Sequence, residues 1–204
     1  MTDKEVLRPQ LWKPRPVKET IAVYADWAET YDRDVQNRGY KTPERLARAL
    51  LNFVEKQKTI LDFGCGTGIS GNALKAAGFE NLHGTDVTAE MLEKASASGL
   101  YSKTWLSEPG HMNFGTGTYD AIVAVGVVSL GAAPPSTLAD LVGSLNTGGI
   151  LAFSYNEPTL EDQSYIKALD DEIRANRVEL LFRENGPHLT DVEMTSDVII
   201  LRRT

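Results

Sequence analysis

Cysteine and histidine are scarce in this sequence. One cysteine, Cys65, and three histidines occur among 204 residues. A single cysteine excludes an intrachain disulfide and a zinc site built from several thiolates. No apolar run approaches the roughly 18 residues that span a bilayer, and residues 1–16 are polar and interrupted by proline, unlike a signal peptide. These absences predict a cytoplasmic setting, no membrane contact and no metal site.

Positive charge is also in short supply. Lys and Arg total 21 against 28 acidic residues, which gives a formal net charge of -7. Proteins that bind nucleic acid usually carry a basic face, so we expect no nucleic-acid partner. The length suits one domain with a sizeable core. We interpret residues 1–18, with three prolines, as a flexible arm and residues 19–204 as the domain.

Apolar periodicity then predicts a regular alternation of strands and helices. Residues 20–35 have nearly helical spacing, and Thr42-Pro43 is typical of a helix start. Five β-like runs alternate with helical stretches after this point, at residues 59–63, 81–87, 101–106, 119–128 and 150–155. This order predicts an α/β fold with a doubly wound, mostly parallel sheet.

The C-terminal part departs from the alternation. Residues 159–176 form a further amphipathic stretch, and residues 178–182 and 198–201 are β-like with no helical stripe between them. Asn185-Gly186 lies in the gap and suits a turn between two antiparallel strands. We therefore expect an antiparallel hairpin at the C-terminal edge of the sheet.

A glycine-rich junction between strand and helix is the strongest chemical signal. Residues 60–68 read ILDFGCGTG, a hydrophobic strand that runs into three alternate glycines. The dinucleotide fingerprint G-x-G-x-x-G places its third glycine one residue later. Here Asp62 also precedes the first glycine by two residues, which would repel a pyrophosphate but attract an ammonium group. S-adenosylmethionine (SAM) has an ammonium and a sulfonium and lacks phosphate.

A second carboxylate supports a nucleoside cofactor. Asp86 ends the second predicted strand, 18 residues after Gly68 (86 − 68). An acidic residue near this spacing accepts hydrogen bonds from ribose hydroxyls. Val87 would then lie against the adenine. Asp86 could alternatively be a helix-capping or solvated residue.

Four segments together resemble the class I SAM-dependent methyltransferase family. They are LDFGCGTG at 61–68, GTDVTAEML at 84–92, YDAIVAVGVV at 119–128 and LNTGGILAFS at 145–154. YDRDV at 31–35, with the short C-terminal strand pair, is similar to the methyltransferase-like group named after the Williams–Beuren region. The resemblance implies a seven-stranded Rossmann-like sheet whose sixth strand is parallel and whose last strand is inserted antiparallel, together with N-terminal lid helices.

The resemblance also implies roles for individual residues. Asp62 and the loop residues would hold the methionine part of SAM, Asp86 the ribose, and Tyr31 would close over the site. The remaining cofactor contacts would come from the glycine loop and the strand ends: Gly64, Cys65, Gly66, Gly68, Val87, Met91, Leu106, Ser107 and Val125. Many members have an acidic residue just after the third strand, and here either Ser107 or Glu108 fills that place.

Other reactive side chains have simpler interpretations. We interpret Cys65 as a small buried residue, because no histidine lies near it in the sequence. His83 is expected to be packed within a strand, and His111 and His188 to be surface residues rather than bases. The aromatic residues of 20–35 (Tyr24, Trp27 and Tyr31) suit either a lid or an ordinary helix face.

These patterns predict transfer of a methyl group from SAM to a small molecule, with S-adenosylhomocysteine (SAH) as product. Tyr155, Asn156 and Glu157 end the fifth strand and are our candidates for contacts to the acceptor. No convincing catalytic base is present in the sequence. Two alternatives remain, a SAM-binding protein without transferase activity and a nucleotide-dependent oxidoreductase.

Overall fold

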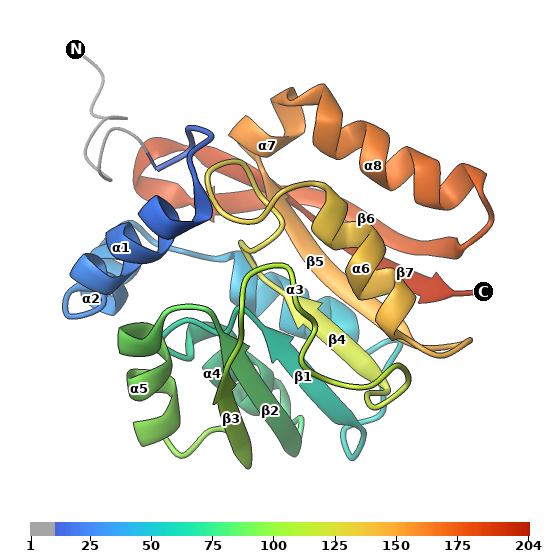
Figure 1. The fold of residues 1–204 in the computed structure, drawn as a ribbon, viewed down its shortest axis with the longest axis horizontal. Coiled ribbons are helices and arrows are strands. Elements are labelled where there is room, and N and C mark those ends of the chain that lie inside the picture. The colour runs from blue at the N-terminus through green and yellow to red at the C-terminus, as the bar shows by residue number, and fades with distance from the viewer. Residues whose placement is uncertain (1–10) are drawn as a thin grey trace.

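We describe residues 11–204 of the chain from a computed structural model. A seven-stranded sheet in the order β3-β2-β1-β4-β5-β7-β6 forms its centre (Figure 1). The strands are β1 (Thr59–Phe63), β2 (Asn81–Asp86), β3 (Lys103–Leu106), β4 (Ala121–Ala124), β5 (Ile150–Asn156), β6 (Val178–Leu189) and β7 (Met194–Arg203). β1 to β5 pair in parallel, and β7 pairs antiparallel with both β5 and β6. The predicted fold class and the inserted last strand are confirmed.

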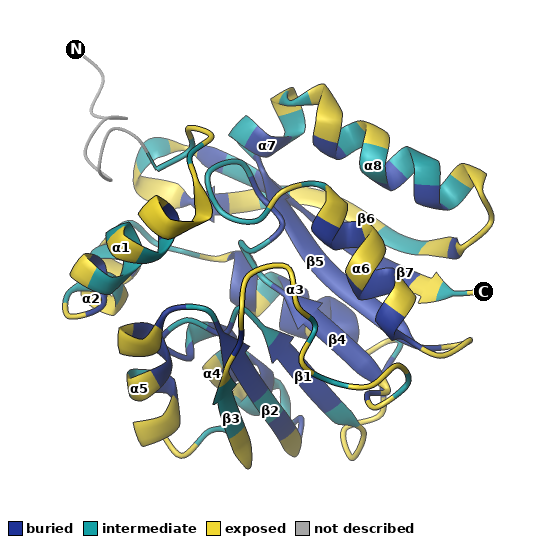
Figure 2. Cartoon of the chain, viewed as in Figure 1, coloured by how far each residue is buried: buried dark blue, intermediate teal, exposed yellow. Residues whose placement is uncertain are grey.

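The centre of the sheet is buried on both faces. All four residues of β4 and all seven of β5 are buried, as Figure 2 shows by their dark colour. Leu46 and Leu50 of α3 (Thr42–Leu50) and Leu74 of α4 (Ile69–Ala77) cover one face. Helices α6 (Ser136–Ser144) and α8 (Gln163–Arg174) cover the other face through Leu141 and Leu169. This double cover explains why the central strands read as continuous apolar runs.

The N-terminal prediction needs one correction. Residues 20–35 form two helices, α1 (Val17–Trp27) and α2 (Tyr31–Asn37), rather than one. The Thr30 hydroxyl and the Trp27 indole N–H both donate to Asp34, at 2.7 and 2.9 Å, which stabilises the turn between the helices. Of the predicted arm, residues 1–10 lie outside the described residues, and α1 already begins at Val17.

Two further boundaries were also wrong. The helix expected over 159–176 is divided into α7 (Glu157–Glu161) and α8, because Asp162 caps α8 by accepting from the Ser164 N–H. Asn185-Gly186 lies inside β6, where Asn185 pairs with Asp197 of β7. The chain instead reverses through Thr190–Val192 and Glu193, which has a φ of 54°.

The topology fixes where a ligand can bind. The chain runs outward from β1 to β3 and then returns to β4, which lies beside β1. At such a switch point the loops after the two strands diverge and leave a crevice at the carboxyl edge of the sheet. Helix α5 (Ala89–Ala97) follows β2 at this edge.

Candidate active site

The loop between β1 and α4 has the backbone geometry that its glycines predict. Gly64, Gly66 and Gly68 have φ values of 70°, 54° and 103°. A Cβ on Gly64 would lie 2.4 Å from Cγ2 of Val127, whereas a Cβ on Gly66 would meet nothing within 4 Å. Gly64 therefore permits close packing against the end of β4, and Gly66 leaves open space above the loop.

Asp62 lies beneath this loop with an unpaired carboxylate oxygen. The hydroxyls of Ser70 and Tyr101 donate to Oδ2, each at 2.6 Å, while Oδ1 is buried and has no hydrogen-bond partner within residues 11–204. Burial raises the pKa of Asp62 to about 6, against the opposing effect of the two hydrogen bonds. A buried carboxylate that lacks a counter-charge suits a cationic cofactor and disfavours a pyrophosphate.

Asp86, at the end of β2, connects the glycine loop to the next strand. Its Oδ2 accepts the Gly66 N–H and its Oδ1 accepts the Thr88 N–H, both at 2.8 Å. Burial raises the pKa of Asp86, and these backbone hydrogen bonds act in the opposite direction. Each carboxylate oxygen keeps a lone pair for a ligand. The local structural role and a contact to ribose are therefore compatible.

A cavity of about 380 Å³ lies above these residues. This volume is within the usual range for small-molecule sites. Eight of the predicted cofactor contacts line it: Tyr31, Gly64, Gly66, Asp86, Val87, Met91, Ser107 and Val125. Both candidates after the third strand, Ser107 and Glu108, are among the lining residues, as is His111.

The other four predicted contacts do not line the cavity. Asp62 is fully buried beneath the loop. Gly68 caps the start of α4. Cys65 is buried against Leu92 and Ala95 of α5, and burial raises the pKa of its thiol, which makes it a poor nucleophile. Leu106 is 53% exposed. Its side chain points away because neighbouring residues of a strand alternate between faces, and Ser107 takes the inner position.

The N-terminal helices cover this site. Their aromatic residues therefore belong to a lid rather than to an ordinary helix face. Thr67 of the glycine loop donates to Asp32 of α2 at 2.5 Å. Tyr24 and Tyr31 both line the cavity. Trp27 packs against Tyr31 with ring centroids 4.8 Å apart. Helices α1 and α2 therefore form a lid whose inner face is aromatic.

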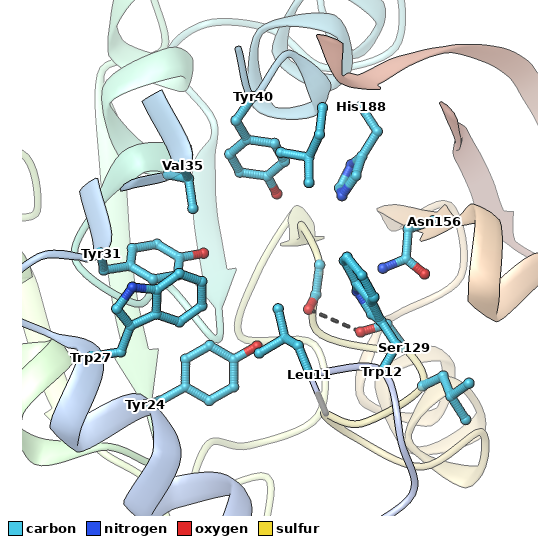
Figure 3. Close-up of a pocket in the computed structure, with 13 residues that line it drawn as sticks. Leu11, Trp12, Tyr24, Trp27, Tyr31, Val35, Tyr40, Ser129, Asn156 and His188 are labelled. Carbon is cyan, nitrogen blue, oxygen red and sulfur yellow. Dashed lines mark hydrogen bonds between the residues drawn. The ribbon is translucent and has the colours of Figure 1, made fainter. Parts of the chain in front are cut away.

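A second, smaller cavity of about 60 Å³ lies beside the first (Figure 3). The two share Tyr24, Tyr31 and Gly126. Figure 3 shows aromatic rings of the lid on one side of the small cavity and His188 and Asn156 on the other. Burial raises the pKa of Tyr24 to about 12 and that of Tyr31 further, so these phenols stay protonated near neutral pH.

The three predicted acceptor contacts differ in position. Asn156 lines the small cavity. Tyr155 points to the opposite face of β5, into the core, where its hydroxyl donates to the Tyr165 carbonyl at 3.4 Å. Glu157 begins α7 and lines neither cavity.

The sequence interpretation missed several residues of the small cavity, among them Trp12, Tyr40 and His188. The expectation that His188 is a surface residue was wrong, because Thr42 and Tyr40 bury it. These partners are more than 140 residues away in the sequence, so no local pattern reveals the contact. His83, in contrast, is packed as expected, 3.0 Å from the Tyr119 hydroxyl.

Two kinds of feature are absent from residues 11–204. No group of three or more His, Cys, Asp or Glu side chains is arranged to hold a metal ion. None of the helices described has the length and apolar character needed to cross a bilayer.

Comparisons with known proteins agree with this geometry. The profile of the family described as "Methyltransferase domain" matches residues 31–192. This range includes the lid helix α2, the glycine loop, and the carboxylates of Asp62 and Asp86. Human "Methyltransferase-like protein 27" is 37% identical over 128 residues, which cover 60% of this chain and 52% of that protein. The chain thus spans about half the length of the curated relatives it matches.

Solved structures share the fold at low sequence identity. Magnesium protoporphyrin IX methyltransferase from Synechocystis PCC 6803, solved with bound SAH, has a TM-score of 0.66 at 14% identity, over 91% of this chain and all of that one. The cyclase SpnF has a TM-score of 0.68, also at 14% identity, over 94% of this chain and 98% of that one. The family match covers well over half of the chain, and the cavity above the glycine loop suits a cationic nucleoside. The chain therefore belongs to the methyltransferase-domain family, enzymes whose methyl donor is S-adenosylmethionine.

Proposed function

We propose that this chain transfers the methyl group of SAM to a small-molecule acceptor and releases SAH. The unpaired Oδ1 of Asp62 beneath the glycine loop carries the cofactor assignment, because it leaves a buried negative charge for the cationic methionine part to offset. Asp86 would hold the ribose hydroxyls. The binding set further comprises the loop glycines, Val87 and Met91 beside the adenine, Ser107 and Glu108 at its edge, Val125 and Tyr31.

The arrangement of the two cavities supports a small acceptor. Lid helices α1 and α2 cover the crevice, and the pocket beyond Gly126 measures about 60 Å³. A pocket of this volume holds a compact group rather than a folded chain. The net charge of -7 also disfavours a nucleic-acid substrate.

When bound, SAM supplies a methyl group that is already activated for displacement. The protein has to hold the acceptor atom in line with that methyl group and exclude water. Tyr24, Tyr31 and Gly126 form the boundary between the cavities, so the donor and acceptor groups meet there. The lid supplies the exclusion of water, because Asp32 fastens it to Thr67.

Two other functions compete with this one. The cyclase SpnF shares the fold, so the fold alone leaves room for a SAM-binding protein that transfers no methyl group. A nucleotide-dependent oxidoreductase is disfavoured by the position of Asp62 and by the glycine spacing. We further propose a cytoplasmic location and one catalytic domain, which includes the whole of α1 from Val17 rather than beginning at residue 19. We also propose membership of the group named after the Williams–Beuren region, suggested by residues 31–35 and the C-terminal strand pair.

Calorimetric titration followed by a transfer assay tests the proposal. We expect SAM and SAH to bind and NADH not to bind. Incubation with methyl-labelled SAM and a low-molecular-weight metabolite extract should then produce SAH and a labelled small molecule. Binding of SAM without any labelled product would favour the SAM-binding protein, and binding of NADH would favour the oxidoreductase.

A further inference from the structure

A directed chain of hydrogen bonds fixes the proton of His188. Arg45 donates to the Ser196 hydroxyl at 3.2 Å, and Ser196 and Thr42 are 2.8 Å apart through their hydroxyl oxygens. Within residues 11–204 the Ser196 proton has no acceptor other than Thr42, so Ser196 donates to Thr42. Thr42 then donates to Nδ1 of His188, at 2.8 Å. The His188 proton is therefore on Nε2.

This Nε2–H group serves the small cavity. His188 lines the cavity and is only 7% exposed, and its Nε2 has no hydrogen-bond partner among the described residues. Burial and the nearby Arg45 lower the pKa of His188 to about 4, so the ring stays neutral near pH 7. Because Nδ1 is already an acceptor, His188 offers the cavity a donor and cannot act there as a base.

Asn156 is oriented in the same way by a second network. Its Oδ1 accepts the Thr159 N–H at 3.2 Å and the Thr159 hydroxyl at 2.6 Å. That hydroxyl in turn accepts the Leu130 N–H at 3.0 Å. A backbone N–H can only donate, so the atom opposite it must be the amide oxygen. The NH₂ group of Asn156 is therefore left to face the cavity that the residue lines, as Figure 3 shows.

The remaining walls contain no compensating charge. Apolar side chains, the rings of Trp12 and Trp27, Ser129 and three phenols complete the lining, and no Asp, Glu, Lys or Arg side chain takes part among the described residues. Ser129 already donates to the Gly126 carbonyl. Burial raises the pKa of the phenols of Tyr24, Tyr31 and Tyr40, so their hydroxyls stay protonated and can also donate. The cavity thus offers several hydrogen-bond donors and no anionic acceptor, which suits a ligand group with lone pairs.

We propose that the small cavity binds the carboxylate of the acceptor between His188 and Asn156, and that the product is a methyl ester. This inference rests on the proposed methyl transfer. A carboxylate has two oxygens, so one can accept from the two donors while the other faces the boundary at Gly126. Charge-assisted hydrogen bonds of this kind are the stronger ones.

The chemistry balances without a base. A carboxylate oxygen forms a bond to the methyl carbon, the carbon–sulfur bond breaks, and its electron pair stays on sulfur. A carboxylate and a sulfonium become a neutral ester and the neutral thioether of SAH, and no proton is released. Opposite charges that neutralise each other react readily in a site without water. A hydroxyl or ammonium acceptor would have to lose a proton, and no group that lines the cavity can take it.

Binding of simple acids tests the site directly. The probes are propionate and benzoate, with propionamide and benzamide as matched neutral controls. They are added to protein loaded with sinefungin, a SAM analogue in which a carbon replaces the sulfur and an ammonium takes the place of the methyl group. We expect the acids to shift the ¹⁵N signal of His188 and to bind about tenfold or more tightly than the amides. Equal binding of acids and amides, or no shift with either, would overturn the proposal. A full shift with sinefungin alone and none with acids would assign the cavity to the cofactor's own carboxylate, which also overturns it.

The transfer assay separates this inference from the proposed function. A methyl ester releases labelled methanol in mild alkali, whereas methyl amines and ethers are stable. Release of labelled methanol supports the carboxylate. A labelled product that resists alkali would leave the proposed function intact and overturn the carboxylate assignment, and the absence of any labelled product would contradict both.

Three variants and one control test the residues assigned to the site. Asn156→Asp keeps the oxygen that Thr159 needs but replaces the donor with a second carboxylate oxygen, so acid binding should fall about tenfold or more. His188→Leu should have a similar effect, whereas His83→Leu should not, because His83 packs against Tyr119 outside both cavities. Thr42→Val removes the hydrogen bond to Nδ1 of His188, so the ring should occupy both neutral tautomers. We expect averaged ¹⁵N shifts for His188 and an unchanged SAM affinity. Normal acid binding by folded Asn156→Asp would refute the assignment.

Discussion

The Thr67 hydroxyl of the glycine loop donates a 2.5 Å hydrogen bond to Asp32 of the lid helix α2. This contact joins two segments that lie 35 residues apart in the sequence. It connects the part of the chain that shapes the cofactor cavity to the part that covers it. The contact therefore gives a direct way to test whether the lid contributes to binding.

We expect Thr67→Val to weaken SAM binding about threefold to tenfold, because loss of one charge-assisted hydrogen bond loosens the lid. The main change should be faster dissociation, measured by stopped-flow tryptophan fluorescence, to which Trp27 of the lid contributes. Thr118→Val removes a hydroxyl that donates to Gly115 outside both cavities and serves as the control. Equal dissociation rates for the two variants would show that the lid contact is irrelevant to retention of the cofactor.

Asp86→Ala should lower SAM affinity at least about tenfold, equivalent to about 1.4 kcal/mol, because the ribose loses its acceptor. The Gly66 N–H also loses its partner, so circular dichroism must first establish that the variant is folded. Calorimetric titration measures the affinity. Asp120→Ala, at a half-exposed ion pair with Lys58, is the matched control and should bind SAM normally. A folded Asp86→Ala protein with normal affinity would refute the ribose assignment.

Asp62→Asn should raise the stability of the protein at neutral pH and weaken its binding of SAM. The folded protein holds the Asp62 proton up to about pH 6, while the unfolded chain releases it near 3.8. The contribution of this group to stability is therefore greatest below about pH 4 and is lost as the pH rises to about 6. Asparagine keeps an oxygen for Ser70 and Tyr101 and has no charge to bury. We expect the variant to be about 1–2 kcal/mol more stable than the wild type at neutral pH, and to lose this advantage near pH 4.

The same variant should bind SAM about tenfold or more weakly, because the buried negative charge is gone. Differential scanning calorimetry across the pH range and calorimetric titration at neutral pH measure the two effects. A variant that is less stable at every pH, or that binds SAM normally, would contradict the role assigned to the unpaired oxygen.

Alanine at Gly64 and at Gly66 should have different effects. Both positions have a positive φ, which costs roughly 1 kcal/mol for a residue with a Cβ. At Gly64 the methyl group would also collide with Val127, so Gly64→Ala should be poorly folded and partly rescued by Val127→Ala. At Gly66 the methyl group enters open space, so Gly66→Ala should fold but bind SAM weakly. Thermal denaturation and titration distinguish the two, and similar melting temperatures would contradict the prediction.

The sequence predicted the parts of the molecule that depend on local patterns. The strand at 59–63, the glycine loop and Asp86 could be found because a strand–turn–helix unit requires apolar alternation and glycine at fixed positions. The Asn185-Gly186 turn was wrong because local turn preference yielded to tertiary pairing. The side chains of Asn185 and Arg183 bind Asp197 across the strands, at 2.8 and 2.7 Å, and carry the strand past the expected turn.

The small cavity depends on contacts between distant segments. His188 owes its burial and its proton position to Thr42, Ser196 and Arg45, which come from another helix and another strand. Trp12 reaches the small cavity from a segment that proline and charge mark as an arm. No spacing rule links such residues, so the sequence pattern predicts the residues of the larger cavity far better than those of the small one.

Gly126 stands where the two compartments meet, with a φ of 70° and the Tyr40 hydroxyl 3.4 Å from the place a Cβ would occupy. The two cavities are thus separated at this point by backbone alone. A side chain there would project toward the Tyr40 hydroxyl and would have to adopt a left-handed backbone conformation, so glycine is the residue that best keeps the passage between the cavities open.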